Sequence, residues 1–432
     1  DWPFQPLVIS ARSKAALEEN SARLAAHLRA HPEQDLADIA WTLKQGRRAL
    51  ERRRVVVATS HDEAATLLEK GDPRRVFTHE ALNAPDVVFM FPGGGAQYAG
   101  MARDLYETEP VFAEWMDRGL AVLQPKLDYD IRALWLPTPA DMASAAERLK
   151  QPSVQLPLIM ISEYALAQLW QSWGVTPAAL IGHSMGENTA ACLAGVLSFE
   201  DCIGLVHLRG QLFDTIPKGG LLSVPLGAEA LRPYLGEALD IAAVNAPGLS
   251  VASGPQSALD DLAARLAGDG IETTRIPIDI AAHSRMLEPI LGRFGDYLHS
   301  IPLHAPQIPI LSNRTGDYLT AAEATDPAYW VAHLRNTVYF ADGLGRLAEG
   351  GKHVFLEVGP GKALSSLAQA HGAISANQVI GTLRHPDDNI ADDAYFMAML
   401  ARMWAVGVEI DWDQIWGEAR RSRVVLPSYA FQ

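Results

Sequence analysis

Short apolar segments of strand length alternate along the chain with longer segments whose apolar residues recur every three or four positions. Apolar residues dominate segments 86–91, 178–181 and 354–358, whereas segments 157–173 and 188–197 have the helical spacing. Apolar strands that alternate with helices are typical of a parallel sheet covered on both faces. The pattern therefore predicts an α/β core.

Residues 220–280 have a different rhythm. Strand-like segments at 221–225, 241–245, 249–253 and 272–276 are separated by helix-like segments near 228–236 and 256–268. A βαββαβ order is the signature of a ferredoxin-like unit. The interval is therefore predicted to be a small subdomain inserted into the core.

The two ends of the chain predict further elements. Residues 7–10 have strand character, Ser13 can cap a following helix, and a second helix is expected over 35–43 before a strand at 55–58. This predicts a small N-terminal α/β domain. Residues 386–432 are expected to form a helix and an extended tail.

Five arginines crowd the segment before the strand at 55–58, namely Arg47, Arg48, Arg52, Arg53 and Arg54. Such a cluster can contact an anion or a partner. Short charge runs more often form a solvated face, which is the interpretation favoured here.

Composition narrows the class of protein. A length of 432 residues allows two or three domains, and a net charge of −15 argues against nonspecific nucleic-acid binding. Two cysteines, Cys192 and Cys202, exclude a disulfide framework and a cysteine-rich metal site, and favour the cytoplasm. No apolar run reaches 18 residues, so no membrane span is expected. The first residues lack a starting Met and a signal-peptide pattern, as in a segment of a longer polypeptide.

The central chemical motif is a G-x-S-x-G at residues 182–186. It follows an expected strand and precedes an expected helix, which is the setting that a nucleophile elbow requires. Glycines permit the tight turn, and the helix N-terminus favours negative charge that develops near Ser184. We interpret Ser184 as a nucleophile.

A serine nucleophile needs a base, and the chain has thirteen histidines. His283 follows the inserted subdomain directly. His183 adjoins the serine, but its side chain is expected to point away from the elbow, so a structural role there is as reasonable as one at the pocket mouth.

Several motifs together resemble a known family. The segments FPGGGAQ (91–97), GHSMGE (182–187), Arg209-Gly210, His283-Ser284 and EVGPG (357–361) occur in the order found in malonyl-CoA:acyl-carrier-protein transacylases. The chain is most similar to acyltransferase domains of modular type I polyketide synthases. This resemblance implies an α/β-hydrolase-like core with an inserted ferredoxin-like subdomain and a small N-terminal α/β linker domain.

The resemblance also implies a division of the chain. Residues 1–85 correspond to a ketosynthase-to-acyltransferase linker, residues 86–219 and 281–385 to the core, and residues 220–280 to the ferredoxin-like subdomain. Residues 386–432 correspond to the linker after the acyltransferase.

Catalytic roles follow from the same resemblance. Ser184 corresponds to the residue that takes the acyl group from coenzyme A. His283 corresponds to the general base of a Ser–His dyad, oriented by a main-chain carbonyl that we place within 336–339. Arg209 corresponds to the arginine that holds the free carboxylate of the extender unit, which a guanidinium can bind with two parallel hydrogen bonds.

The remaining site residues are also implied by the family. The main-chain amides of Gly94 and Met185 correspond to the oxyanion hole. Gly94 stands where most relatives have Gln, a change that leaves the main-chain donor in place. The expected substrate pocket consists of Gln97, Gln151, His183, Ile280 and Ala282, and Asn245 matches a structural asparagine.

The family implies no metal and no bound cofactor, with a coenzyme A thioester as substrate. The implied partners are an acyl carrier protein and the neighbouring ketosynthase of the same synthase. Neither nucleic acid nor a membrane is expected as a partner.

Substrate choice rests on two positions. Malonyl relatives usually have a Phe where Ala282 stands, and a Phe there would fill the space that an α-methyl group needs. Met185 also resembles the residue after the nucleophile in methylmalonyl enzymes. These features favour methylmalonyl, although an open pocket also admits malonyl.

Two other functions fit parts of the sequence. A serine hydrolase or thioesterase would need an acidic residue between Ser184 and His283 in the chain, for which Asp261 and Asp279 are candidates. It would give no reason for Arg209. A non-catalytic scaffold domain is the third hypothesis, and the intact Ser184 and His283 argue against it.

Overall fold

The computed structural model describes residues 2–417 and 421–430, which form two compact units. The flanking unit draws on residues 1–87, 170–176 and 382–432. The central unit consists of residues 88–169 and 177–381. No helix in the described ranges combines the length and the apolar character needed to cross a membrane.

The flanking unit contains an antiparallel sheet with the order β1-β2-β3, in which Leu7 lies opposite Val56. The Ser13 side chain caps α1, as expected from the sequence, and the Asp35 side chain caps α2. Its elements are β1 (Gln5–Ala11), α1 (Lys14–Ala30), α2 (Leu36–Gln45), β2 (Arg52–Ala58), α3 (His61–Lys70), β3 (Val76–Glu80), α18 (Asp392–Ala405) and α19 (Asp413–Trp416).

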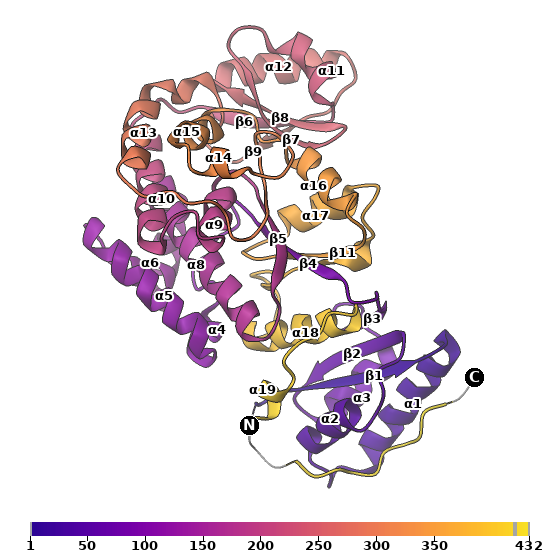
Figure 1. The fold of residues 1–432 in the computed structure, drawn as a ribbon. Coiled ribbons are helices and arrows are strands. Elements are labelled where there is room, and N and C mark those ends of the chain that lie inside the picture. Colours follow the sequence, from indigo (N-terminus) through magenta and orange to yellow (C-terminus); the bar gives the residue numbers. More distant parts are fainter. Residues whose placement is uncertain (1, 418–420, 431–432) are drawn as a thin grey trace. The chain divides into compact units, whose positions relative to one another are not determined.

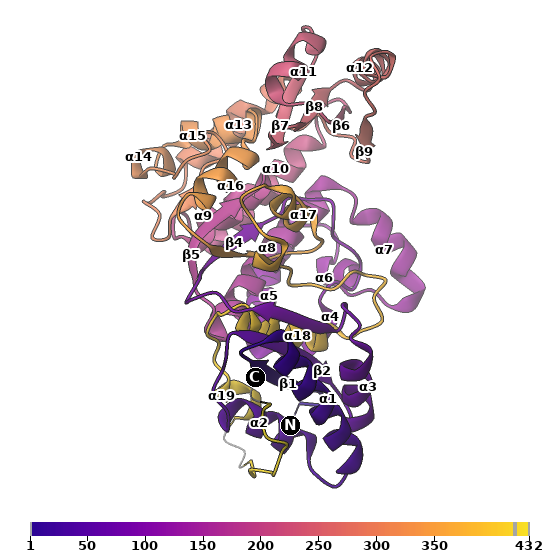
Figure 2. The ribbon, with the colours of Figure 1, turned by 90° about the vertical axis from the view of Figure 1, so that its right-hand side faces the viewer.

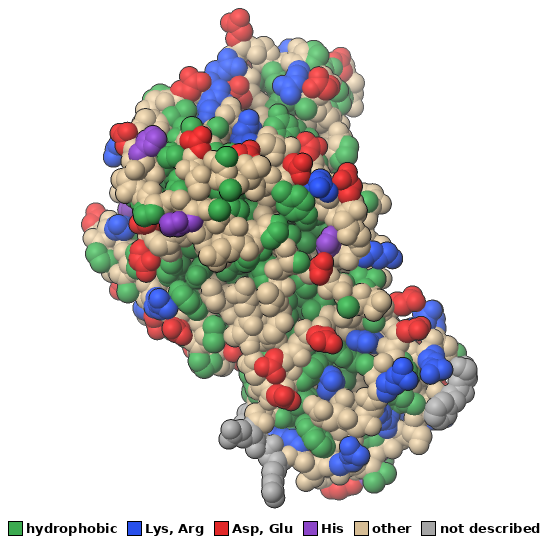
Figure 3. Space-filling view, in the orientation of Figure 1, with side chains coloured by type: hydrophobic (Ala, Val, Ile, Leu, Met, Phe, Trp, Pro, Cys, Tyr) green, Lys and Arg blue, Asp and Glu red, His purple; other side chains and the backbone are tan. Residues whose placement is uncertain are grey.

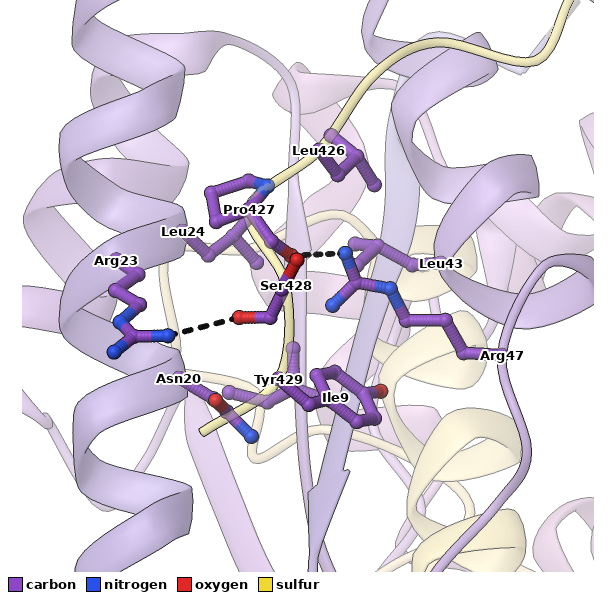
Figure 4. A pocket seen from close by; sticks show the side chains of 10 residues that line it. All are labelled: Ile9, Asn20, Arg23, Leu24, Leu43, Arg47, Leu426, Pro427, Ser428 and Tyr429. Atoms are coloured by element: carbon purple, nitrogen blue, oxygen red, sulfur yellow. Dashed lines mark hydrogen bonds between the residues drawn. The ribbon is translucent and has the colours of Figure 1, made fainter. Parts of the chain in front are cut away.

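The extended tail near the C-terminus lies against α1 and α2 of this unit (Figure 4). Arg23 donates to the Ser428 carbonyl over 3.0 Å, and the Arg47 guanidinium donates to the Pro427 carbonyl and lies 4.4 Å from the centre of the Tyr429 ring. The expected extended tail is confirmed for residues 421–430, and the rest of the predicted tail after α19 lies outside the described residues.

The arginine cluster is less solvated than expected. Arg47 binds the tail, and Arg53 donates to the Trp404 carbonyl over 2.8 Å while it packs on the Trp404 ring. Figure 3 shows further Lys and Arg side chains spread over the visible face of this unit. Two members of the cluster thus contact other segments of the chain, because the folded tail and α18 provide main-chain acceptors that sequence spacing does not reveal.

The central unit is built on a sheet whose described strands have the order β10-β5-β4-β11-β12. The β5–β10 and β11–β12 pairs are parallel, as the apolar segments predicted. These strands are β4 (Asp86–Phe91), β5 (Pro177–Gly182), β10 (Ile310–Leu311), β11 (His353–Glu357) and β12 (Val379–Ile380).

Helices surround this sheet (Figure 2). They are α4 (Arg103–Thr108), α5 (Pro110–Leu123), α6 (Ile131–Trp135), α7 (Met142–Arg148), α8 (Pro152–Ser172), α9 (Met185–Leu193), α10 (Phe199–Phe213), α13 (Leu291–His299), α14 (Ala321–Ala324), α15 (Pro327–Arg335), α16 (Phe340–Ala348) and α17 (Ala363–Ala370). Short 3-10 turns lie at Gln124–Lys126, Pro139–Asp141, Arg285–Ile290 and Ala376–Gln378. Strands alternating with covering helices confirm the predicted α/β core.

The inserted subdomain has the predicted βαββαβ order and a four-stranded antiparallel sheet, within the described residues, of order β7-β8-β6-β9. This is the ferredoxin-like arrangement. Its elements are β6 (Gly220–Val224), α11 (Ala228–Leu235), β7 (Asp240–Ala246), β8 (Leu249–Gly254), α12 (Gln256–Gly268) and β9 (Thr274–Ile276).

The two faces of the small sheet pack differently. Helices α11 and α12 cover one face (Figure 1), where Leu222 and Val224 meet Leu231 and Leu262. The other face carries Val251, which packs with core residues of the central unit. The alternation of side chains along each strand therefore joins the subdomain to the core.

Candidate active site

A sharp turn between β5 and α9 presents Ser184. The main chain of Ser184 has φ 56° and ψ −120°, a conformation that residues other than glycine rarely adopt. Helix α9 begins at the next residue. The expected helix over 188–197 was therefore placed too late, because the helical spacing at its start is hidden by the glycines of the motif.

Both glycines of the motif are required by close packing. A Cβ at Gly186 would lie 1.9 Å from the Phe91 carbonyl oxygen, and one at Gly182 would lie 2.1 Å from the Glu187 nitrogen. No larger residue fits at either position without a shift of the main chain. The motif thus has a steric basis in this fold.

The Ser184 hydroxyl lies between a base and a cation. Its Oγ is 2.7 Å from His283 Nε2 and accepts a hydrogen bond of 2.8 Å from Arg209 Nη2. A hydroxyl that accepts from a guanidinium is free to donate its proton to a neutral imidazole. The structure thus brings together the three residues that the family resemblance singled out.

His283 is buried, with 4% of its surface exposed, and has φ 54°. Burial, followed by the charge of Arg209 and by His183, lowers the pKa of His283 well below its usual value. The main-chain carbonyls of Asn336 and His333 partly offset this by favouring the protonated ring, although Nδ1 makes no hydrogen bond of normal geometry. Asn336 belongs to the predicted stretch 336–339.

Those carbonyls belong to the C-terminal end of α15, where helix carbonyls lack partners within the helix. The partial negative charge of a helix C-terminus stabilises a cation nearby. A histidine that takes up a proton here is therefore supported by main-chain dipoles in place of a carboxylate.

Arg209 is a buried cation, with only 2% of its surface exposed. It donates to Asn188 Oδ1 over 3.1 Å, and its Nε has no hydrogen-bond partner among the described residues. Burial lowers the pKa of Arg209 to about 9, while the charge of Glu187 acts in the opposite direction. The guanidinium stays charged at neutral pH and keeps a donor free for an anion.

Gly94 and Met185, the residues expected to form the oxyanion hole, both line the cavity around Ser184. Met185 is the first residue of α9, so its N–H has no partner within the helix. Gly94 lines the same cavity from the loop after β4. Hydrogen-bond donors of this kind can hold a developing oxyanion.

The space that a side chain at position 94 would need is occupied by neighbouring side chains. A Cβ at this position would lie 2.5 Å from Gln155 Oε1 and 3.1 Å from Leu156 Cδ2. The Gln155 side chain, which donates to the Lys150 carbonyl over 2.9 Å, thus occupies the room that a larger residue would need.

A cavity of about 430 Å³ contains Ser184, His283 and Arg209. The predicted pocket residues Ile280 and Ala282 line it. Apolar side chains from the small sheet and from the core helices complete the wall, including Leu221, Val251, Ile276, Phe213, Leu364 and Leu367. An apolar cavity with a few convergent polar groups is typical of a small-molecule site.

His183, which was also predicted for the pocket, lines the cavity as well. Its Nε2 lies 2.8 Å from Asn245 Oδ1, and burial lowers the pKa of the imidazole. Asn245 belongs to β7 of the inserted subdomain, a contact partner that the sequence could not indicate. The pair joins the elbow to the subdomain.

Gln97 and Gln151 are not among the residues that line this cavity, so their placement in the pocket was wrong. The Gln97 side chain accepts a hydrogen bond from the Gly95 N–H and donates one to the Leu149 carbonyl, so it binds main-chain groups. Gln151 is exposed at the start of α8. Gln155, one helical turn further along, lines the cavity instead.

The structure adds two buried polar residues, Glu187 and Asn313, to which the sequence analysis gave no role. Glu187 accepts hydrogen bonds of 2.6 Å from the Asn313 N–H and from the Tyr329 hydroxyl, and burial raises its pKa to about 7. Asn313 contacts the elbow directly. The final residue of the GHSMGE segment was a weak signal for Glu187, whereas Asn313 had none.

A hydrolase triad is not formed. Asp261 and Asp279 are both exposed, and no carboxylate in the described part of the chain hydrogen-bonds to His283. The serine hydrolase hypothesis therefore lacks its third residue.

Among known protein families, the acyl transferase domain family matches residues 88–406, a range that includes the whole site. The chain belongs to the acyl transferase domain family. A second family, described as CurL-like, PKS C-terminal, matches residues 5–68.

This acyl transferase domain is similar to parts of large synthases. It is 35% identical over 99% of its length to a phenolphthiocerol/phthiocerol polyketide synthase of Mycobacterium tuberculosis, and it covers 29% of that protein. It is 36% identical over 99% of its length to the erythronolide synthase EryA3 of Saccharopolyspora erythraea, covering 14%. The chain spans less than a third of these relatives.

Solved acyl transferase domains have the same fold. The acyl transferase domain of ZmaA matches with a TM-score of 0.90 at 36% identity, covering 99% of both chains. The acyltransferase domain from module 8 of the salinomycin polyketide synthase matches with a TM-score of 0.86 at 34% identity, covering 95% of this chain and 98% of the other. These matches confirm the predicted family resemblance and fold.

Proposed function

We propose that this acyl transferase domain loads a carboxyacyl extender unit from coenzyme A onto Ser184 and passes it to the phosphopantetheine thiol of an acyl carrier protein. The observation that carries the proposal is the Ser184 hydroxyl held between His283 and the buried Arg209. A serine hydrolase of simple esters would have no use for a buried cation with a free donor beside its nucleophile.

In the first half-reaction, Ser184 Oγ attacks the thioester carbonyl as its proton passes to His283 Nε2. The Gly94 and Met185 amides hold the oxyanion of the tetrahedral intermediate. The carbon–sulfur bond then breaks, and the imidazolium returns the proton to the coenzyme A thiolate. Ser184 is left as an acyl ester, and coenzyme A leaves.

In the second half-reaction, His283 takes the proton of the carrier-protein thiol. The sulfur attacks the ester carbonyl, and the bond to Ser184 Oγ breaks. The imidazolium returns its proton to Ser184. The kinetics are therefore expected to be ping-pong.

Arg209 selects the substrate by holding its free carboxylate with charge-assisted hydrogen bonds. Its side chain already reaches Ser184, so a carboxylate bound there would lie close to the nucleophile. Acyl groups without a carboxylate would leave this buried charge unpaired, which disfavours them.

For the extender unit itself, we propose methylmalonyl over malonyl. Ala282 lines the cavity with a small side chain, and apolar residues surround it. A solved acyl transferase domain of SpnD, 37% identical, is in complex with 2-(pent-4-yn-1-yl)malonyl, which supports room for an α-substituent in this fold. The expected discrimination between methylmalonyl and malonyl is small, because one methyl group changes selectivity by only about 1–3 kcal/mol.

The test is intact-protein mass spectrometry after brief mixing with equimolar malonyl-CoA and methylmalonyl-CoA. A dominant methylmalonyl adduct, absent from Ser184→Ala, is expected, followed by its transfer to a carrier protein. A dominant malonyl adduct would overturn the extender-unit choice. No adduct from either thioester would overturn the transferase assignment.

The variant Ala282→Phe provides a matched control for the pocket. Phe at this position should fill the α-methyl space and move the adduct ratio toward malonyl by about 10-fold or more. An unchanged ratio would mean that other walls of the cavity determine the choice.

The partners follow from the similarity to polyketide synthases. We propose that the domain works beside a ketosynthase of the same polypeptide and serves a carrier protein of that synthase. Its expected location is the cytoplasm.

A further inference from the structure

Asn313 lies beside the nucleophile elbow because of the sheet register. Strand β10 pairs in parallel with β5, with Ile310 opposite Leu180 and Leu311 opposite Ile181. Asn313 follows β10 by two residues, so it comes level with the start of the elbow. Its surface is 1% exposed.

The Asn313 side chain bonds to the main chain on both sides of the turn. Its Oδ1 accepts from the Ser184 N–H over 3.1 Å, and its Nδ2 donates to the Gly182 carbonyl over 2.7 Å. The Asn313 side-chain amide thus holds the main chain at Gly182 and at Ser184, on either side of His183.

The Asn313 main chain is also held. Its N–H donates to Glu187 Oε1 over 2.6 Å, and its carbonyl accepts from the Tyr339 N–H over 2.7 Å. Glu187 in turn accepts from the Tyr329 hydroxyl. The main chain of Asn313 is therefore hydrogen-bonded both to α9 and to the segment before α16.

Asn313 also touches the segment behind the base. His333 Nε2 lies 3.3 Å from Asn313 Oδ1, and the His333 main-chain carbonyl is one of the two that favour the protonated form of His283. The rings of His283 and His333 are 6.4 Å apart. One side chain thus connects the serine side and the histidine side of the site.

The Ser184 N–H needs such a partner. Ser184 lies between the end of β5 and the start of α9, so its N–H belongs to neither the strand ladder nor the helix. A buried donor without an acceptor and an unusual main-chain conformation both destabilise the turn, and they persist only where the surroundings hold them.

We propose that Asn313 is the positioning residue that holds Ser184 Oγ in reach of His283 and of the substrate carbonyl. The inference rests on the proposed function of Ser184 as nucleophile. Asn313 touches neither the substrate nor the reacting atoms, and it acts through the main chain of the elbow. Its loss should therefore slow acylation without weakening the binding of the acyl donor.

The experiment compares the purified wild-type chain with Asn313→Ala. The first-order rate of self-acylation at saturating carboxyacyl-CoA should fall about 100-fold, because a small displacement of a reacting group has effects of that size. The dissociation constant of the same thioester, measured with and without Asn313→Ala in the Ser184→Ala background, should change less than threefold.

Reaction with a fluorophosphonate gives an independent readout, because that probe requires neither Arg209 nor coenzyme A. Labelling of Ser184 should slow by a similar factor in Asn313→Ala. Fluorophosphonate labelling of a wild-type chain that takes no carboxyacyl adduct would refute the proposed substrate while leaving the positioning role measurable.

Two further variants control for folding. Asn20→Ala removes a buried asparagine of the flanking unit, which donates to the Ser10 carbonyl, and should leave both rates unchanged. Asn313→Asp keeps an acceptor for the Ser184 N–H but loses the donor to Gly182, so its loss of rate should be smaller than that of alanine. Wild-type acylation rates in folded Asn313→Ala and Asn313→Asp, or a loss confined to donor binding, would overturn the inference.

Discussion

At the scale of single residues, the site contains buried polar groups whose pKa values differ from those of the same side chains in water. Arg209 is charged without a carboxylate partner in the described residues, and His283 is neutral beside it. Burying an unpaired cation costs stability, which is acceptable where a substrate later supplies the anion. Function and stability should therefore separate at this position.

Replacing Arg209 by Met tests that separation. Burial lowers the pKa of Arg209, so the protonated side chain destabilises the folded state at every pH below about 9. The neutral variant should be more stable by about 1–4 kcal/mol, as when buried charges elsewhere are replaced by apolar groups. Calorimetry should show a higher unfolding midpoint, and carboxyacyl adducts should disappear. A less stable variant would show that Asn188 and the serine hold the cation better than inferred.

The pH dependence of self-acylation follows from the protonation states of His283 and Arg209. His283 must be neutral to accept the serine proton, and because its pKa is lowered well below 6.5 it is neutral at pH 6.5 and above. Arg209 must be charged to hold the carboxylate, and it loses its proton near pH 9. The value of kcat/KM should be flat from about pH 6.5 to 8, and should fall above about 9. An acidic limb above pH 7 would contradict the burial effect on His283.

Substitutions at Gly94 and Gln155 should have non-additive effects on the acylation rate. Gly94→Ala places a methyl group against Gln155 Oε1, so it should reduce the acylation rate by about tenfold through displacement of the loop. Adding Gln155→Ala removes the closer of the two contacts, leaving the one of 3.1 Å to Leu156, and should restore most of the rate. The double-mutant cycle measures this directly; additive losses would mean that Gln155 acts on the substrate independently of Gly94.

At the scale of elements, the turn from β5 to α9 depends on how closely α9 approaches the loop after β4. A Cβ at Gly186 would lie 1.9 Å from the Phe91 carbonyl oxygen, whereas a Cβ at Gly292 in α13 meets nothing within 4 Å. These two helical glycines therefore form a matched pair.

Gly186→Ala should destabilise the central unit by several kcal/mol and stop acylation, because main-chain atoms must separate. Gly292→Ala should be neutral or stabilising by about 0.4–1 kcal/mol, since it removes only conformational freedom of the unfolded chain. Chemical denaturation of both variants checks the contrast. A folded, active Gly186→Ala enzyme would contradict the close approach.

The sequence predicted elements where each segment had its own pattern. Segment 86–91 matches β4, and segment 256–268 matches α12. The prediction failed at α9, whose first turn contains Gly186, and for the short strand β10, whose two residues carry no periodic signal. Elements whose stability comes from packing are not visible in a local pattern.

At the scale of the whole molecule, the two units combine segments that are distant in sequence. The flanking unit joins the first 87 residues to segment 382–432, and the tail contributes hydrogen bonds to Arg23, Arg47 and Asn20. The candidate active site lies entirely within the central unit. The tail should therefore stabilise one unit without affecting the chemistry of the other.

Deleting residues 425–432 tests this independence. Amides of α1 near Asn20 should exchange with solvent faster, because the tail no longer covers them. The rate at which Ser184 is acylated should stay within about twofold of the wild type. Hydrogen-exchange mass spectrometry and the acylation assay together check both parts, and a large loss of acylation would refute the independence.

The sequence by itself pointed to Ser184 through its G-x-S-x-G motif, and the family resemblance added His283 and Arg209 as the residues expected beside it. The sequence also determined the alternation of strands and helices, since apolar spacing reports which face of a segment is buried. The family resemblance placed Ile280 and Ala282 in the cavity, but only the tertiary structure decided the rest of its lining. Gln155 replaced Gln97 and Gln151, and Asn313 joined the elbow through the β5–β10 register. Contacts between residues far apart in the chain depend on packing and register, which no local pattern encodes.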